Sequence, residues 1–302
     1  MVVPTNGSDH IELQDPLVLF LARWVFAGTG IVANSIVMLV FIYNKTYKKS
    51  LSLKLLLHQT VIDLIGSVMF LIFYNIDVPD GTGGTIFCKT ETLFFYVFVT
   101  STYNFVLLTV ERYIAIVHPL LYRQKSFGRK VTYISLICPH VSGLLITVNL
   151  PIYAEKNPNG QICSYERFNA IVGIIFSIVD WLIPICIMLY CYVQMLLKLH
   201  KTRIVNDNLS TEFQPRNDRQ NRVKRNLIKT LIIIAFVYFV TVTPSTVSFL
   251  VYFISDSYDY TLNEVVILLL DLNLTINPFI YCMVYKDFQR GIHKIRNDIF
   301  HG

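Results

Sequence analysis

Long apolar runs, separated by short polar segments, dominate the chain. A bilayer core about 30 Å thick needs about 20 mostly apolar residues of helix to cross it, and seven runs reach that length. Backbone polar groups inside a membrane must be satisfied within the segment, so each run is expected to be a helix. The predicted spans are Leu17–Tyr43, Leu55–Ile76, Phe87–Val117, Val131–Tyr153, Ala170–Leu197, Leu227–Ile254 and Leu262–Tyr285. The predicted fold is an all-α membrane protein, a bundle of seven transmembrane helices.

Lysine and arginine concentrate in one set of connecting segments, which favours a cytoplasmic location for that set. These segments contain Lys45, Lys48, Lys49, Arg123, Lys125, Arg129, Lys130, Lys198, Lys201 and the basic cluster from Arg216 to Arg225. The opposite set is mainly acidic. We therefore expect an extracellular amino terminus and a cytoplasmic carboxyl terminus. The sequon Asn6-Gly7-Ser8 then lies outside the cell, where Asn6 can be glycosylated.

Composition agrees with a membrane protein. Charged residues make up 15% of the chain, against roughly a quarter in soluble domains. The net charge of +6 does not indicate a nucleic-acid partner, because the basic residues are confined to short segments between spans. The polar, acidic first residues do not resemble a cleavable signal peptide. The first apolar run is therefore expected to direct membrane insertion.

Two motifs at span ends are informative through their positions. The third span closes with Glu111-Arg112-Tyr113, followed by His118-Pro119-Leu120, and the seventh ends in Asn277-Pro278-Phe279-Ile280-Tyr281. Asn34 and Asp63 in spans one and two, with Pro184 and Pro244 in spans five and six, complete the pattern. Over nearly its whole length the chain resembles the rhodopsin-like, class A G-protein-coupled receptors. Each motif alone is weak, whereas the set is specific.

The resemblance implies three parts of the chain and a signalling role. Residues 1–16 would be an extracellular tail, 17–285 the transmembrane bundle, and 286–302 an amphipathic eighth helix, marked by Phe288, with a short cytoplasmic tail. The expected location is the plasma membrane. The expected partners are an extracellular ligand, membrane lipid and a heterotrimeric G protein, which outward movement of span six would activate.

Activation roles follow from the same resemblance. Glu111 would neutralise Arg112 in the resting state, and Tyr192 and Tyr281 would reach toward Arg112 in the active state. The adjacent Tyr113, Asn277 and Pro278 belong to the same machinery. Some family members lock span three to an acid on span six, but Lys224 stands at that place. We therefore expect the inactive state to be held in another way.

Asp63 is a carboxylate in mid-membrane, which is energetically costly and indicates a function or a buried partner. In the family this position binds an allosteric sodium ion, and Ser101, Asn273 and Asn277 would supply further oxygens. The alternative is a hydrogen-bonded structural aspartate without an ion. No other cofactor is expected.

Cysteine and tryptophan positions show where the chain follows the family and where it departs from it. The resemblance implies a Cys88–Cys163 disulfide, and both cysteines lie on the expected oxidising side. Cys88 precedes Arg112 by one residue fewer than usual, which leaves the register of upper span three open by one residue. The family's tryptophans in spans four and six are missing, and Val242 replaces the second.

The choice of ligand class depends on a few positions toward the extracellular side. Phe94 stands where amine receptors have aspartate, and Asp271 stands where opsins have their Schiff-base lysine. We expect Phe94, Asp180, Asp271 and Glu264 to contribute to ligand binding, and the acids favour a basic peptide. A lipid or another small non-amine ligand remains the alternative.

Other functional classes fit less well. The motifs HExxH, GxSxG and the GxGD pair of intramembrane proteases are absent from the sequence, so no enzymatic activity is expected. His58 and His140 are interpreted as packing or capping residues rather than metal ligands. A transporter should show paired broken helices in corresponding halves, and the sequence shows no such symmetry.

Overall fold

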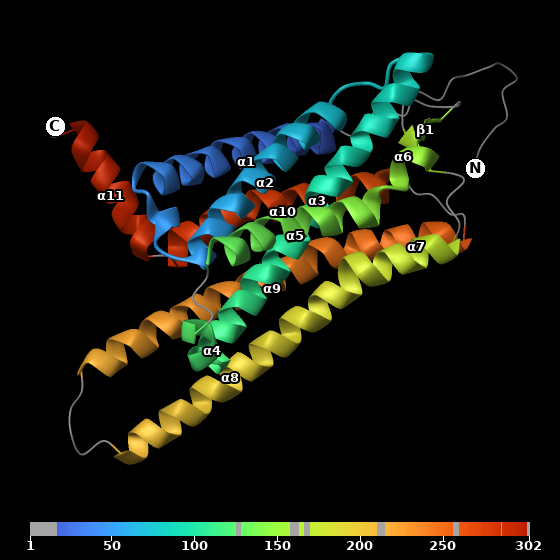
Figure 1. Ribbon diagram of the computed structural model, residues 1–302. Helices are drawn as coiled ribbons and strands as arrows, with labels where there is room; N and C mark the ends of the chain where they lie inside the picture. The colour runs from blue at the N-terminus through green and yellow to red at the C-terminus, as the bar shows by residue number, and fades with distance from the viewer. Residues whose placement is uncertain are drawn as a thin grey trace, which may run out of the picture.

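The computed structural model describes residues 17–124, 128–157, 163–165, 170–209, 215–255, 260–284 and 286–300. Seven helical segments are long and apolar enough to cross a membrane. They run side by side as one bundle (Figure 1), which confirms the predicted fold class. The helices are α1 (Leu17–Tyr43), α2 (Leu51–Phe73), α3 (Thr82–Val117), α4 (Pro119–Gln124), α5 (Arg129–Thr147), α6 (Leu150–Tyr153), α7 (Ala170–Ser177), α8 (Ile183–Leu209), α9 (Pro215–Ser255), α10 (Tyr260–Val284) and α11 (Lys286–Phe300). A 3-10 turn (Thr46–Lys48), a π-helical turn (Ile178–Leu182) and the strands β1 (Glu155–Lys156) and β2 (Cys163–Ser164) complete the fold.

The distribution of polar side chains is inverted relative to a soluble domain. Asn34, Gln59 and Asp63 are fully buried between helices, whereas large apolar residues such as Val32 and Leu39 are exposed on the outer surface. An apolar outer surface has no hydration cost where lipid surrounds it, and buried polar groups then need partners inside the bundle. The surface therefore suits lipid, and the polar interior is where specific interactions are concentrated.

Some helices begin or end at residues other than the ends of the apolar runs, because local capping groups and proline set the boundaries. The second span begins at Leu51 rather than the expected Leu55, because the Ser50 side chain accepts a hydrogen bond from the Leu53 amide at 3.3 Å. This is N-capping. The fourth span ends as a separate short helix, α6, which has Pro151 in its first turn. Helices α8 and α9 continue far beyond the other spans at the end of the bundle where α4 lies (Figure 1).

Close helix contact brings α5 against α3. At Gly143 on α5, an added Cβ would lie 2.3 Å from Thr100 Oγ1 and 3.2 Å from the Tyr96 carbonyl oxygen on α3. Glycine is therefore required for this approach. The contact places His140 of α5 next to Tyr96, where the two side chains form a hydrogen bond.

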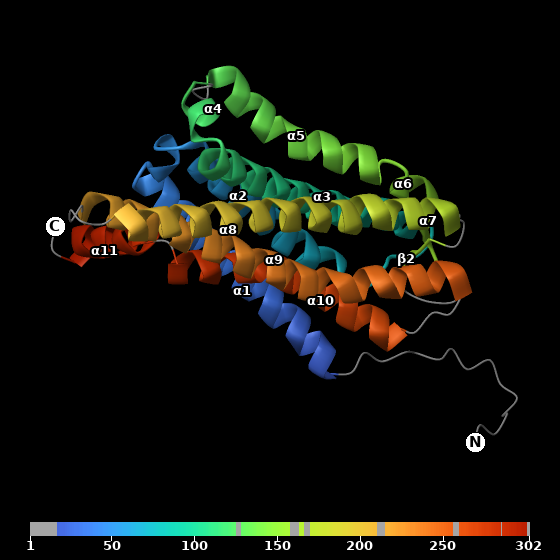
Figure 2. The same cartoon turned by 90° about the horizontal axis from the view of Figure 1, so that it is seen from below.

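The predicted eighth helix is present as α11. It turns away from the direction of α10 at the end of the bundle opposite β1 (Figures 1 and 2). Phe288 is buried and packs against Phe41 of α1, with ring centroids 6.2 Å apart. The hydroxyl of Tyr43 donates to Asp298 at 2.9 Å. Both contacts hold α11 against the end of α1.

Candidate functional site

Glu111, at the end of α3 near α4, is held in place by contacts with three side chains. Glu111 is buried, and its Oε2 lies 3.4 Å from Arg112 Nε. Ser52 of α2 donates a hydrogen bond to the same carboxylate, and the Tyr122 hydroxyl of α4 donates to Oε1 at 2.7 Å. Burial, together with the neighbouring Glu111 carboxylate, raises the pKa of Tyr122, so its hydroxyl stays protonated and donates. Glu111 is therefore tied to two neighbouring helices while it neutralises Arg112.

The three tyrosines of this region have separate partners or environments. The Tyr192 hydroxyl lies 3.0 Å from the Oγ1 of Thr109, two residues before Glu111, and Tyr281 is buried. Tyr113 lies 3.3 Å from His118 Nε2 through its hydroxyl. Tyr192 thus bonds to Thr109 instead of reaching Arg112, and Arg112 pairs with Glu111. This is the arrangement expected for a resting state.

The middle of the bundle contains a hydrogen-bonded aspartate, Asp63. Its Oδ1 accepts from Gln59 Nε2 at 2.7 Å and from Ser101 Oγ at 2.9 Å, and its Oδ2 accepts from Asn277 Nδ2 at 2.9 Å. The expected fourth member, Asn273, instead donates to Thr241 Oγ1 at 3.0 Å. Three protein groups therefore present hydrogens to Asp63. A cation requires oxygen lone pairs, so this donor set does not fit sodium.

A π-helical turn interrupts the fifth span between α7 and α8. At Ile178–Leu182 the regular helical hydrogen-bonding pattern is interrupted, which is a common feature of functional sites. Tyrosine hydroxyls bond to two carbonyls of the turn: Tyr103 donates to Val179 O at 2.9 Å, and Tyr238 donates to Asp180 O at 3.0 Å. These bonds fix the turn between α3 and α9 and hold Asp180 inward, where it is buried.

Asp180 lines a cavity of about 50 Å³ between α3, α7, α9 and α10. Its wall is mostly apolar and includes Phe95, Phe98, Tyr165, Val242 and Leu270. Asp180 is the one carboxylate among the described residues of this wall, and its Oδ1 has no hydrogen-bond partner among them. Such an acid in an apolar cavity is suited to a basic group from outside the chain.

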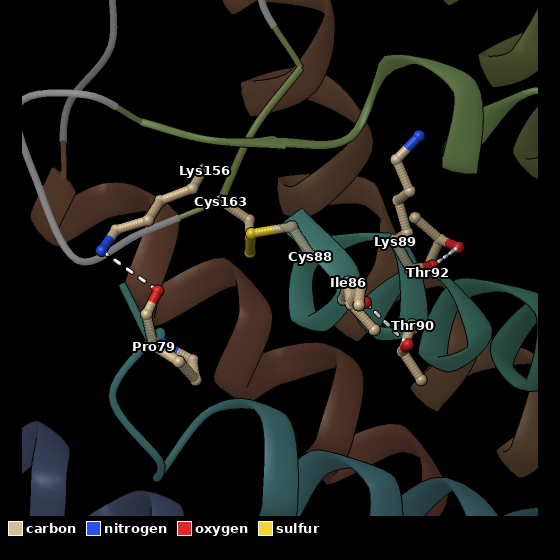
Figure 3. The surroundings of a disulfide bond; sticks show 8 residues. All are labelled: Pro79, Ile86, Cys88, Lys89, Thr90, Thr92, Lys156 and Cys163. Atoms are coloured by element: carbon tan, nitrogen blue, oxygen red, sulfur yellow. Dashed lines mark hydrogen bonds between the residues drawn. A yellow bond between two sulfur atoms is a disulfide. The ribbon is translucent and has the colours of Figure 1, made fainter. Parts of the chain in front are cut away.

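A disulfide between Cys88 and Cys163 joins α3 to β1, β2 and Tyr165, a segment that we call the lid; the resemblance implied this bond. Figure 3 shows the bond joining the start of α3 to the segment after β1. On β1, Lys156 donates to the Pro79 carbonyl at 3.1 Å (Figure 3). Tyr165 follows Cys163 by two positions and lines the cavity. The disulfide therefore holds Tyr165, at the cavity wall, near the start of α3.

Comparison with known proteins identifies the family. A sequence model described as "7 transmembrane receptor (rhodopsin family)" matches residues 33–281. The chain belongs to the rhodopsin family of G-protein-coupled receptors. Membership accounts for the seven spans, the Glu111-Arg112-Tyr113 motif and the motif ending in Tyr281. The protein is a receptor of the plasma membrane and not an enzyme, with a G protein and an extracellular ligand as partners.

Similar receptors cover most of the chain at modest identity. G-protein coupled receptor 183 of Bos taurus is 25% identical over 88% of this chain and 77% of its own length. C-X-C chemokine receptor type 2 of Oryctolagus cuniculus is 25% identical over 95% of this chain and 80% of its own. Proteinase-activated receptor 2 of Rattus norvegicus is 26% identical over 86% and 66%, respectively. One of these names refers to a chemokine, one to a proteinase and one to no ligand, so together they do not indicate a single ligand class.

Of the four residues expected to bind ligand, the structure brings only Asp180 to the cavity wall. Phe94 is buried against Phe70 and Tyr74, and its neighbour Phe95 faces the cavity instead. The one-residue shift agrees with the short spacing from Cys88 to Arg112. Phe94 therefore lies next to the cavity wall rather than on it.

The two acids of α10 also differ from expectation. Glu264 was expected to be an outer acid available to ligand, but it is buried and forms an ion pair with Arg23 of α1. Asp271 is fully buried, and neither of its oxygens has a hydrogen-bond partner among the described residues. Its neighbour Leu270 lines the cavity. Asp271 thus lies one residue from the cavity wall rather than on it.

Sequence reasoning missed several residues that shape these sites: Arg23, Ser52, Gln59, Tyr103 and Tyr122. Two of them carried a readable signal. Arg23 is a cation inside an apolar run, which demands a buried partner, and Gln59 lies one helical turn before Asp63, on the same face. Asn6 and the side chain of Lys224 lie outside the described residues, so glycosylation and the absent lock stay predictions.

Proposed function

We propose that this receptor binds an extracellular ligand bearing a basic group, with Asp180 as the anchor, and activates a heterotrimeric G protein. The proposal places the amino terminus and the disulfide outside the cell, and α4, α11 and the basic segments inside. The excess of lysine and arginine near the inner ends of the spans supports this orientation.

The observation that carries the proposal is the unpartnered Oδ1 of Asp180 in an apolar cavity. Burying a charge without a partner is costly, so such a group is expected to gain one when ligand binds. The volume of about 50 Å³ is far below the 300 Å³ or more of typical ligand pockets. The cavity would therefore accept one side group of a larger ligand, such as an ammonium or guanidinium.

A basic peptide fits these requirements, because one side chain could enter the cavity while the remainder lies over the lid. The apolar wall also favours a second candidate, a lipid or another small non-amine ligand whose hydrocarbon part contacts Phe95, Phe98 and Val242. Only the peptide uses the Asp180 carboxylate as an ionic partner. The two candidates therefore differ in their dependence on this charge.

Ligand binding would reach the G-protein side through α9. Tyr238 on α9 donates to the Asp180 carbonyl, and Val242, one turn further along, lines the cavity. A ligand group that displaces either residue would favour outward movement of α9. Arg112 would then leave Glu111 and face the G protein, with Tyr192 and Tyr281 turned toward it.

The test compares agonist classes on matched variants. Cells expressing the receptor with chimeric G proteins would be screened with basic peptides and with lipids. Each agonist found would then be titrated on Asp180→Asn and on Asp77→Asn, which removes the same charge from an exposed outer position. Loss of a charge-assisted hydrogen bond is expected to reduce peptide potency roughly 10- to 100-fold for Asp180→Asn and to leave Asp77→Asn near wild type.

Surface expression of both variants is measured in parallel, so that folding defects are separated from lost recognition. A peptide agonist with unchanged potency on well-expressed Asp180→Asn would exclude the carboxylate as its anchor. A screen in which only lipids activate, with equal potency on all three proteins, would establish the second candidate instead.

A further inference from the structure

The side-chain amide of Gln59 lies beside Asp63, the aspartate whose counterpart in the family binds sodium. Gln59 is fully buried on α2, and its Nε2 donates to Asp63 Oδ1 at 2.7 Å and also to Ser101 Oγ. The Ser101 hydroxyl in turn donates a hydrogen bond to Asp63 Oδ1. The amide nitrogen thus contacts the two atoms that would otherwise be the first ligands of a cation.

The direction of the amide is determined by a backbone group. Asn104 Nδ2 donates to the Leu55 carbonyl at 3.1 Å, and a carbonyl can only accept. The same Nδ2 donates to Gln59 Oε1 at 2.7 Å. The oxygen of Gln59 therefore faces Asn104, and its NH₂ group must face Asp63 and Ser101. A flipped amide would place two donors together at Asn104 and an oxygen against the carboxylate.

The same constraint runs outward from Asn104 to a pair of histidines. Since Asn104 Oδ1 is the acceptor, His58 Nδ1 at 3.0 Å carries a hydrogen. When both imidazoles are neutral, His58 Nε2 then accepts from His140 Nε2 at 2.9 Å, and His140 Nδ1 accepts from the Tyr96 hydroxyl at 2.9 Å. Every hydrogen bond from Tyr96 to Asp63 points the same way. Such chains polarise and stiffen their members, so the amide of Gln59 is held in place.

The remaining expected ligands also offer hydrogens rather than lone pairs, or bond elsewhere. Asn277 presents Nδ2 to Asp63 Oδ2, and Asn273 is engaged with Thr241. Three donors on one carboxylate supply the electrostatic stabilisation that a bound cation would otherwise provide. They also link α2, α3 and α10 through a single group.

We propose that the Gln59 amide is a built-in substitute for the sodium ion, so that this receptor is stabilised at Asp63 by its own side chain and is insensitive to sodium. The inference is independent of the ligand and of Asp180. The amide and the ion would occupy the same place: removal of the Gln59 amide opens space beside Asp63 and Ser101, and sodium can then bind there.

The experiment measures apparent melting temperature of the purified, ligand-free receptor in NaCl and in KCl, each at about 0.15 M. The wild type is expected to melt at the same temperature in both salts. Gln59→Leu, which removes the amide, is expected to gain a sodium-specific increase of about 2 to 4 °C, because a ligand that binds only the folded state stabilises it. The double variant Gln59→Leu/Asp63→Asn should lose that increase.

A sodium-specific shift in the wild type that disappears in Asp63→Asn would overturn the proposal, as would a folded Gln59→Leu protein without any sodium response. If Gln59→Leu does not fold, ²³Na NMR linewidths of wild-type receptor and Asp63→Asn decide the question. Equal linewidths support the built-in substitute, and broader lines in the wild type contradict it.

Discussion

The middle of the bundle and the half nearer the disulfide differ in how fully their buried carboxylates are hydrogen-bonded. In the middle, Asp63 accepts three hydrogen bonds, and the chain that supplies one of them continues to Tyr96 without a missing partner. Toward the disulfide, Asp180 and Asp271 have carboxylate oxygens without partners among the described residues. A satisfied network rigidifies a core, whereas an unsatisfied group retains the capacity to bind. The contrast separates an acid that links helices of this receptor from acids that have oxygens without a partner among the described residues.

The largest expected effect comes from breaking the satisfied network at Asn104. Asn104→Leu leaves the His58 Nδ1 hydrogen and Gln59 Oε1 buried without partners. Each stranded group costs about 1–3 kcal/mol, so a loss of roughly 2–6 kcal/mol and a lower apparent melting temperature are expected.

Thr100→Val on the same helix is the matched control. Thr100 is equally buried, but among the described residues its hydroxyl bonds only to the Tyr96 carbonyl of its own helix, and valine has nearly the same shape. Its melting temperature should stay within a few degrees of wild type. Equal losses for the two variants would show that the network contributes no more than an isolated hydroxyl.

The second prediction compares the same change, aspartate to asparagine, at one residue in each region. Asp271→Asn replaces an unpartnered buried carboxylate with a neutral amide of similar volume and should stabilise the receptor by about 1 kcal/mol. Asp63→Asn turns one acceptor oxygen into a donor that faces other donors, and should destabilise by about 1–3 kcal/mol. Thermal denaturation of both variants in potassium salts measures the difference. Shifts of the same sign would contradict the division into satisfied and unsatisfied regions.

The parts of the molecule predicted from sequence are those that depend on one segment at a time. Run length identified seven spans, and the motifs at Arg112 and Tyr281, together with Cys88 and Cys163, led to the family and its disulfide. The eighth helix followed from Phe288. Run length is a property of a single helix in lipid, so tertiary context has little power to override it.

The parts that were missed depend on contacts between segments. Gln59 could be placed on the face of Asp63, but its amide direction depends on Asn104 of another helix. Glu264 appeared free because its partner, Arg23, lies on the first span. Phe95 rather than Phe94 lines the cavity, and the sequence had left the register of upper α3 open by one residue. Pairings of this kind are fixed by helix rotation, which hydrophobic runs alone do not specify.

The smallest effect is expected at the solvent-exposed rim, where the acid Asp80 does have a partner. Lys156 donates to Asp80 and holds the pKa of that exposed carboxyl below its ordinary value of 3.8. A lowered pKa in the folded state means that the ionised carboxyl stabilises the fold above pH 3.8, and this contribution is lost as pH falls through the lowered pKa.

Asp80 is almost fully solvated, so water and salt screen the pair. Asp80→Asn should therefore change the melting temperature by less than about 1 °C at neutral pH and by nothing measurable at the most acidic pH tolerated. The Lys156 bond to the Pro79 carbonyl does not involve the carboxylate, so the lid should keep its position. A decrease of several degrees at neutral pH would mean that this rim pair, and not the buried network, orders the end of the receptor that carries the disulfide.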